Sequence, residues 1–236
     1  RAAVVVDCTA DADLAVRAGC ACANETHDVT LRVVAEGIDR ERAAVFEKEE
    51  PERYKKTAAE AAALNGGAMP DRGRHVKGID VADAAALTRA ETEIRRGYFA
   101  ALYHLRAHMP GWETARIADT SRQLGVRQGR RIRGEYTVTN DDLCSSRHFD
   151  DGVARLASCM DGYALYKPAG LDYDIPYRCL VPRGVGGLLV AGRCVSAGYL
   201  ACNSLRLLVP CFATGQAAGA AAARAAKAGA ERRAVP

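Results

Sequence analysis

The sequence has few of the features that mark membrane or nucleic-acid-binding proteins. Its 236 residues contain no apolar run that approaches the roughly 18 residues of a membrane-spanning helix, and they show no signal peptide. Aromatic residues make up 6% of the chain and are not interleaved with basic ones, as single-stranded nucleic-acid binding would need. The formal net charge of +4 is mild and spread along the chain. We therefore expect neither a nucleic acid nor a membrane as a partner.

The nine cysteines are an odd number and are scattered, several of them inside apolar or small-residue segments. This usage is typical of a reduced cytoplasmic protein in which cysteine serves as a small hydrophobic residue. Cys20 and Cys22 lack the two-residue spacer of zinc and redox motifs. His104 and His108 lie four residues apart on an expected helix, but the glutamate of the HExxH zinc motif is absent. The sequence thus predicts no metal site and indicates a cytoplasmic location.

Both ends of the chain show a strand, a turn and a helix. Near the N-terminus, an apolar strand is expected at residues 2–6 and a helix at residues 11–18. Near the C-terminus, the continuous apolar run at residues 188–191 suits a strand covered on both faces. A tight glycine turn follows it, and a helix rich in small residues can begin near Pro210. These patterns predict an α/β arrangement.

The middle of the chain predicts a mixture of helices and strands. The clearest helix covers residues 81–108, where Asp80 can act as the N-cap and apolar residues recur at spacings of three, four or seven. A charged helix at residues 42–64 is interrupted by Pro51. Strands are expected at residues 29–35, 116–120, 128–139 and 153–160. The middle region is therefore expected to be of the α+β type.

The C-terminal helix carries Gly215, Ala217 and other small residues along its first turns. Their lack of bulk lets a ligand or a strand approach the backbone, and the unpaired amides of the first turn would then face an electron-rich acceptor. The alternative is an alanine-rich helix packed closely on a sheet, since small residues serve close packing equally well.

Several separated segments carry a resemblance to a known family. IPYRCLVP, LLVAGR and SLRLLVPCFATGQAAGAAAA resemble the C-terminal part of the FAD-dependent oxidoreductase family, in which a flavin sits in a Rossmann-like domain interrupted by a second domain. VVVDCTADAD at residues 4–13 is similar to that family's VIDATGDAD segment, and GVRQGRRI at residues 125–132 is similar to its GVRETRRI segment. The segments follow one another in the family's order.

The resemblance implies an α/β fold, an incomplete FAD/NAD(P)-binding Rossmann-like domain interrupted by an α+β insertion. Residues 1–24 and 187–236 would be the two segments of the FAD domain, and residues 25–186 the inserted region that contacts substrate. Family members open with a GxGxxG turn that holds the ADP half of FAD, and no GxGxxG occurs in this sequence. We therefore interpret the chain as the later part of a longer protein, whose missing FAD-binding segment a partner chain could supply.

The resemblance also implies a set of cofactor-binding residues. Thr9, Ala10 and Asp11 stand where the family has Thr-Gly-Asp, and Ala10 adds a Cβ where glycine would let the backbone close on the cofactor. Gly192 and Arg193 belong to the AGR turn that this sequence shares with the family.

Further cofactor contacts are expected downstream of that turn. Arg206 is a second candidate anchor, and Gly215, Gln216 and Ala217 are the candidates on the C-terminal helix. The guanidinium of either arginine could pair with a phosphate or with a substrate carboxylate, or it could form an ordinary structural ion pair.

An arginine-rich segment in the middle of the chain supplies the candidate catalytic residues. In an extended strand, alternation would place Arg127, Arg131 and Arg133 on one face and Arg130 on the other, apolar face. A buried arginine needs a partner, so Arg130 is the first candidate for binding an anionic substrate or orienting the flavin, with Arg127 the second. The alternative for Arg130 is a structural salt bridge.

The sequence as a whole favours the C-terminal part of an FAD-dependent oxidoreductase that passes a hydride between a small organic substrate and the flavin. The alternative is a non-catalytic scaffold remnant or interaction subunit that keeps the fold but does not bind FAD by itself. The missing GxGxxG supports this alternative directly.

Overall fold

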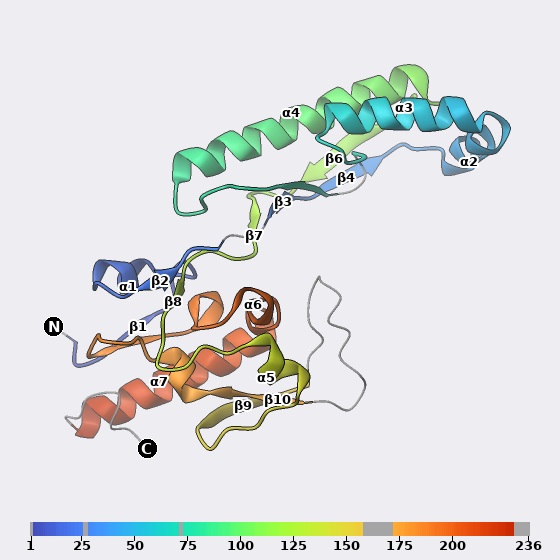
Figure 1. Cartoon of the computed structure of the whole chain (residues 1–236). Helices are drawn as coiled ribbons and strands as arrows, with labels where there is room; N and C mark the ends of the chain where they lie inside the picture. Colours follow the sequence, from blue (N-terminus) through green and yellow to red (C-terminus); the bar gives the residue numbers. More distant parts are fainter. Residues whose placement is uncertain (1, 26–27, 71–72, 158–171, 229–236) are drawn as a thin grey trace. The chain divides into compact units, whose positions relative to one another are not determined.

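The chain forms two compact units, residues 1–26 with 127–236 and residues 27–126. Figure 1 shows the helices and strands of the computed structural model, which describes residues 2–25, 28–70, 73–157 and 172–228. The first unit combines segments from both ends of the chain. Both units mix helices with strands, which is an α/β composition.

The second unit is shorter than the inserted region that the sequence suggested. The expected insertion covered residues 25–186, whereas the compact unit ends at residue 126. The segment after residue 126 returns to the N-terminal part of the chain, because β8 (Arg131–Ile132) pairs in antiparallel fashion with β2 (Cys22–Ala23).

A parallel pair of strands joins the two ends of the chain in the first unit. β1 (Val5–Asp7) pairs with β11 (Leu188–Val190). All three residues of β11 are buried, so the prediction of a covered strand here is confirmed. α1 (Asp13–Arg17) follows β1 after a short turn, and α7 (Leu208–Ala228) packs against β11. The C-terminal helix thus begins two residues earlier than the sequence indicated.

The remaining elements of the first unit are short. They are α5 (Asn140–Cys144), the antiparallel pair β9 (Gly152–Leu156) and β10 (Tyr173–Pro176), α6 (Tyr199–Leu205), and 3-10 turns at Tyr177–Leu180 and Gly192–Cys194. The long strand expected at residues 128–139 is reduced to the two residues of β8. Beyond it the backbone makes only isolated bridges, at Gly134 and Val138.

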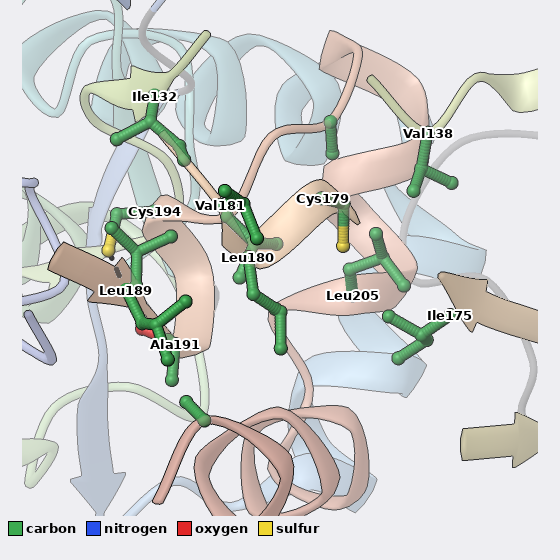
Figure 2. Packing of buried hydrophobic residues seen from close by; sticks show 14 of the residues in the cluster. Ile132, Val138, Ile175, Cys179, Leu180, Val181, Leu189, Ala191, Cys194 and Leu205 are labelled. Atoms are coloured by element: carbon green, nitrogen blue, oxygen red, sulfur yellow. Dashed lines mark hydrogen bonds between the residues drawn. The ribbon is translucent and has the colours of Figure 1, made fainter. Parts of the chain in front are cut away.

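One hydrophobic core gathers these elements. Figure 2 shows side chains from β8, β10, β11, α6 and the two 3-10 turns packed together, among them Ile132, Ile175, Leu180, Leu189 and Leu205. Residues after 126 therefore pack with β11. This shared core explains why the first unit extends beyond the two terminal segments.

In its described residues, the second unit contains two small sheets and three helices. β3 (Val29–Leu31) lies between β5 (Arg74–Val76) and β7 (Gly125–Val126), and β4 (Val33–Glu36) pairs with β6 (Arg116–Thr120); all these pairings are antiparallel. The helices are α2 (Arg40–Glu49), α3 (Pro51–Leu64) and α4 (Ala84–His108), and α3 packs along α4 (Figure 1).

The helix boundaries follow from their capping residues. Pro51 starts a second helix in its first turn, where its missing N–H costs nothing, so the charged segment forms α2 and α3. α4 begins after Asp83, whose side chain accepts a hydrogen bond from the backbone N–H of Ala85 at 2.8 Å. Asp80, the predicted cap, bonds to Ala82 N in the preceding turn. No helix in the described ranges combines the length and apolar character that crossing a membrane requires.

α4 is fixed to the three-stranded sheet by the buried Tyr98. Its hydroxyl accepts a hydrogen bond from Arg74 N at 2.8 Å and donates one to the carbonyl oxygen of Leu31. Burial raises the pKa of Tyr98, so the hydroxyl keeps the proton that it donates.

A buried carboxylate anchors α5 in the first unit. Thr139 donates two hydrogen bonds to Asp142 Oδ2, from its backbone N–H and from its hydroxyl, both at 2.8 Å. The Tyr136 hydroxyl donates to Asp142 Oδ2 at 2.9 Å, and Arg147 donates to Oδ1 at 2.8 Å. Burial alone would raise the pKa of Asp142. These hydrogen bonds outweigh it, so the pKa lies below its usual value.

We expect the first unit to lose stability as the pH falls below about 4, because the unfolded chain then takes up a proton at Asp142 while the folded state, with its lowered pKa, still holds the charged form. A carboxyl group with a lowered folded pKa contributes its full stabilisation above the unfolded pKa and loses it on acidification. Urea unfolding between neutral pH and about pH 3 measures this loss. Asp142→Asn should reduce the dependence of the free energy of unfolding on pH. Asp141→Asn, at an exposed position, should leave that dependence unchanged. If the free energy of unfolding fell with pH equally in both variants, the acid loss could not be assigned to Asp142.

Candidate functional site

A cavity lies just beyond the carboxyl ends of the two parallel strands. It has a volume of about 340 Å³. The residues after β1 and β11 contribute Cys8, Ala10, Ala191, Gly192 and Arg193, and the segment from α6 to α7 contributes Arg206, Cys211 and Gly215. In α/β proteins ligands bind at this end of parallel strands. The volume is at the low end for a drug-sized ligand, so it accommodates one part of a dinucleotide.

The turn after β1 is built around the buried carboxylate of Asp7. Its Oδ1 accepts hydrogen bonds from the backbone N–H and the hydroxyl of Thr9 at 2.9 and 2.7 Å, and its Oδ2 accepts one from Ala15 N at 2.8 Å. The hydroxyl of Thr9 in turn accepts a bond from Asp13 N. Thr9 is therefore engaged in shaping the turn and does not line the cavity. Sequence reasoning missed Asp7, although a carboxylate at the end of a strand was the available signal.

Ala10 lines the cavity with a left-handed backbone. Its φ is 72°, a region that costs an L-residue roughly 1–2 kcal/mol and that glycine occupies freely. Ala12 in the same turn has a φ of 56° but is fully buried in the core. The family's glycine at the position of Ala10 thus has a conformational reason in this structure.

We expect Ala10→Gly to stabilise the protein by about 0.5–1 kcal/mol, since relief of the left-handed strain exceeds the added flexibility of the unfolded chain. Ala12→Gly is the matched control. It relieves similar strain but removes a buried methyl group, so we expect no net gain from it. Thermal and urea unfolding compare the two variants, and a destabilised Ala10→Gly would show that the turn is not strained.

Arg193 is held at the edge of the cavity by an acidic partner. Its Nη2 lies 2.8 Å from Asp11 Oδ2, and both side chains are largely buried. Asp11 therefore does not line the cavity itself, but it forms an ion pair with Arg193, which does. Arg206 reaches the same cavity from the segment between α6 and α7. Two arginine residues thus line one small cavity, which favours an anionic group within it.

Two glycines form a cradle in the cavity wall. Gly192 has a φ of 81°, and its backbone N–H donates to Thr214 Oγ1 at 3.1 Å. A Cβ at Gly192 would meet only Cys211 Sγ at 4.0 Å, and a Cβ at Gly215 would meet nothing within 4 Å. Both positions leave room for a flat group to approach the backbone closely. This space fits the flavin ring that the sequence predicts.

The cavity faces the side of α7 rather than its first-turn amides. Cys211 and Gly215 lie one helical turn apart, and Cys211 N already donates to Leu207 O. The prediction that free amides of this helix face the ligand is therefore not supported by the contacts at the cavity. At this cavity α7 contributes Gly215, which has no side chain to fill the space.

Gln216 and Ala217 point elsewhere. They line a second, larger cavity of about 940 Å³, which α7 forms together with β9 and Tyr177. Neighbouring residues of a helix are about 100° apart, so Gly215 and these two residues cannot all face one site. Seven of the predicted cofactor residues thus gather at or behind the first cavity, whereas these two do not.

The thiols in the cavity are weak nucleophiles. Burial, together with the nearby charge of Asp7, raises the pKa of Cys8. Burial also raises the pKa of Cys211, against the opposing effect of Arg193 and Arg206. Both thiols are thus protonated at neutral pH. The described residues that line the cavity include no carboxylate or imidazole, so they suit binding and orientation rather than proton transfer.

Arg130 is tied to the turn after β1. Its Nε donates to the carbonyl oxygen of Asp11 at 2.9 Å, and its Nη2 forms an ion pair with Asp13. This is the structural salt bridge that the sequence left open as an alternative. Arg127 is half-buried, and its side chain forms no hydrogen bond or ion pair with any residue in the described ranges. Neither candidate catalytic residue lines the cavity.

The buried arginine of this segment is Arg131, which is 1% exposed. The alternation argument placed it on the wrong face because only Arg131 and Ile132 are in a strand, and both are buried there. Arg131 Nε donates to Ala197 O at 3.0 Å, and Nη1 donates to Gln128 Oε1 at 2.8 Å and to Glu25 O at 3.1 Å. Its Nη2 donates to Glu25 Oε2 at 2.8 Å.

Gln128 extends this network to α6. Its Nε2 donates to Tyr199 O at 2.8 Å and to Asn203 Oδ1 at 2.9 Å, and the side chain is fully buried. Together Arg131 and Gln128 fix the chain between the AGR turn and α6. Gln128 stands where the family's GVRETRRI segment has a glutamate, and nothing in its sequence context indicated this positioning role.

Metal chemistry has no support from the described side chains. Within that part of the chain, no group of three or more His, Cys, Asp or Glu side chains could hold a metal ion. His104 instead lies beside Glu60, with 3.2 Å between Nε2 and Oε2.

A family model described as FAD dependent oxidoreductase matches residues 1–236, the full length of the sequence. No curated protein matches the chain, and no solved structure matches it.

Proposed function

Because the chain belongs to the FAD dependent oxidoreductase family, whose cofactor is FAD, we propose that it serves hydride transfer between a small organic substrate and the flavin. The observation that carries this proposal is the cavity at the carboxyl ends of β1 and β11, where a glycine cradle and two arginines meet. FAD, when bound, supplies the ring that accepts or donates the hydride.

The residues of the cavity would hold the cofactor and orient it. Gly192 and Gly215 allow close approach to the backbone, and Ala10 also lines the cavity. Arg193 and Arg206 would stabilise negative charge, either on a phosphate or on the reduced ring. Arg130 acts as a positioning residue, because it holds the turn that carries Ala10 and Asp11.

We further propose that β1 and β11 are part of a Rossmann-like domain that the second unit interrupts. Within the described residues β1 has a strand partner on one edge only, and Val5 is 41% exposed. Leu14 and Val16 of the neighbouring α1 are exposed as well. An additional strand and helix carrying the GxGxxG turn would cover these apolar side chains and bind the ADP half of FAD. A partner chain is one source of such a segment.

A non-catalytic scaffold is the second candidate function. The specific observation in its favour is the lack of GxGxxG, together with a cavity too small for a whole dinucleotide. In this case the chain would keep the fold of the family and would bind FAD only when another segment supplies the ADP site.

An absorbance titration of the purified chain with FAD separates the two candidates. The proposed function predicts flavin bands near about 370 and 450 nm that stay with the protein through gel filtration and bleach when a substrate reduces the flavin. Riboflavin is the matched ligand control, because it carries the ring without the ADP half. A protein that retains neither ligand would overturn the proposal and leave the scaffold as the remaining function.

A further inference from the structure

One exposed face of α4, in the second unit, carries two aromatic side chains between two arginines. Arg96, Phe99, Tyr103 and Arg106 follow one another at spacings of three and four, so they share one face of the helix. Phe99 is 47% and Tyr103 65% exposed. Neither arginine side chain has a hydrogen-bond or ion-pair partner in the described part of the chain. We call these four residues the α4 stripe.

A complementary face lies on α2. Glu41, Val45 and Glu49 are one turn apart and exposed, and Val45 is 51% exposed. The two glutamates have no side-chain partner among the residues that the structure describes. Phe46, next to Val45, is buried against α4 and fixes the helix with Val45 outward. We call Glu41, Val45 and Glu49 the α2 stripe.

The two stripes belong to the same end of the second unit. Asp39 N donates to Gly111 O at 2.8 Å, and Arg42 Nη2 lies 3.2 Å from Glu113 Oε1. α2 therefore starts beside the residues that follow α4. A two-fold symmetric interface uses the same patches of both copies, so two complementary patches in one region of the unit suit it.

We propose that the α4 stripe of one copy packs against the α2 stripe of a second copy, and reciprocally, in a two-fold symmetric dimer of this chain. The charges are complementary in sign and the stripes match in length, about 15 Å for α4 and about 12 Å for α2 at 1.5 Å per residue. Val45 packs between Phe99 and Tyr103 and keeps water from the flanking ion pairs. The dimer does not depend on the proposed flavin chemistry.

Charge reversal on each stripe tests the dimer in sedimentation equilibrium. Arg96→Glu with Arg106→Glu should raise the dimer dissociation constant at least about 100-fold, and Glu41→Arg with Glu49→Arg should do the same, because like charges then face each other. An equimolar mixture of the two double variants should form a heterodimer, because both of its contacts again join opposite charges. This recovery distinguishes a specific interface from a folding defect.

Lys56→Glu with Lys77→Glu is the matched control, since it changes the net charge equally at exposed positions outside both stripes. It should leave the dimer intact. A wild-type chain that stays monomeric at every concentration would overturn the proposal. An unchanged dissociation constant in both double variants would overturn it as well. So would double variants that fold but form no heterodimer when mixed, and either result would point to a different partner for the α4 stripe.

Discussion

Replacing Arg131 by methionine is expected to lower the free energy of unfolding by about 2–4 kcal/mol, the cost of leaving buried acceptors without a donor. The side chain is 1% exposed, and its guanidinium donates to Ala197 O, Gln128 Oε1 and Glu25. Methionine fills much of the volume but donates nothing, so buried acceptors at Ala197 and Gln128 lose their partner. Urea unfolding of the full chain at neutral pH measures the loss.

Arg133→Met is the matched control for this prediction. Arg133 is exposed, and among the described residues only its backbone contributes hydrogen bonds, to Ala21 and Arg183. We expect a change within about 0.5 kcal/mol for it. Equal effects at Arg131 and Arg133 would show that the network around Gln128 does not support the fold. Because the network also fixes the start of α6, Arg131→Met should weaken flavin binding even where the protein remains folded.

Gly215→Leu is expected to abolish flavin binding, with a loss of affinity of at least about 100-fold, and to leave the fold intact. A Cβ at this position meets nothing within 4 Å and Gly215 lines the cavity, so we expect the leucine side chain to extend into the cavity. It would occupy the space that a flavin ring needs against α7. Leucine also has a better helix propensity than glycine, which makes unfolding an unsuitable explanation for the loss.

Gly219→Leu provides the control, one turn further along the same helix. Its Cβ also meets nothing within 4 Å, but Gly219 lines neither of the two cavities described above. Titration with FAD should therefore give wild-type affinity for this variant. Normal FAD binding by Gly215→Leu would show that the flavin lies elsewhere, and the larger cavity beside Gln216 would become the alternative site.

The ends of the chain could be predicted well from the sequence. A continuous apolar run followed by Gly192 can form little except a covered strand and a tight turn, and the structure has both. Residues from the two ends meet at one cavity because parallel strands bring their carboxyl ends together. The contacts of Thr9, Ala10, Asp11 and Arg193 follow from that pairing.

The middle of the chain was harder to predict for a physical reason. Alternation locates the buried face only when the residues form a regular strand, and residues 127–130 do not form one. The burial of Arg131 depends on acceptors supplied by Glu25 and Ala197, which are distant in sequence. For the same reason Gln216 and Ala217 could not be separated from Gly215 without the position of β9 beside α7.

The pairing of β1 with β11 has a consequence for biosynthesis. The two strands are about 180 residues apart, so β1 must wait for the synthesis of all the residues between them before its partner leaves the ribosome. Residues 27–126 are contiguous and can fold while β1 is still waiting. During this interval β1 is an open strand edge in a nascent chain, which makes chaperone protection of β1 most valuable until β11 has been synthesised.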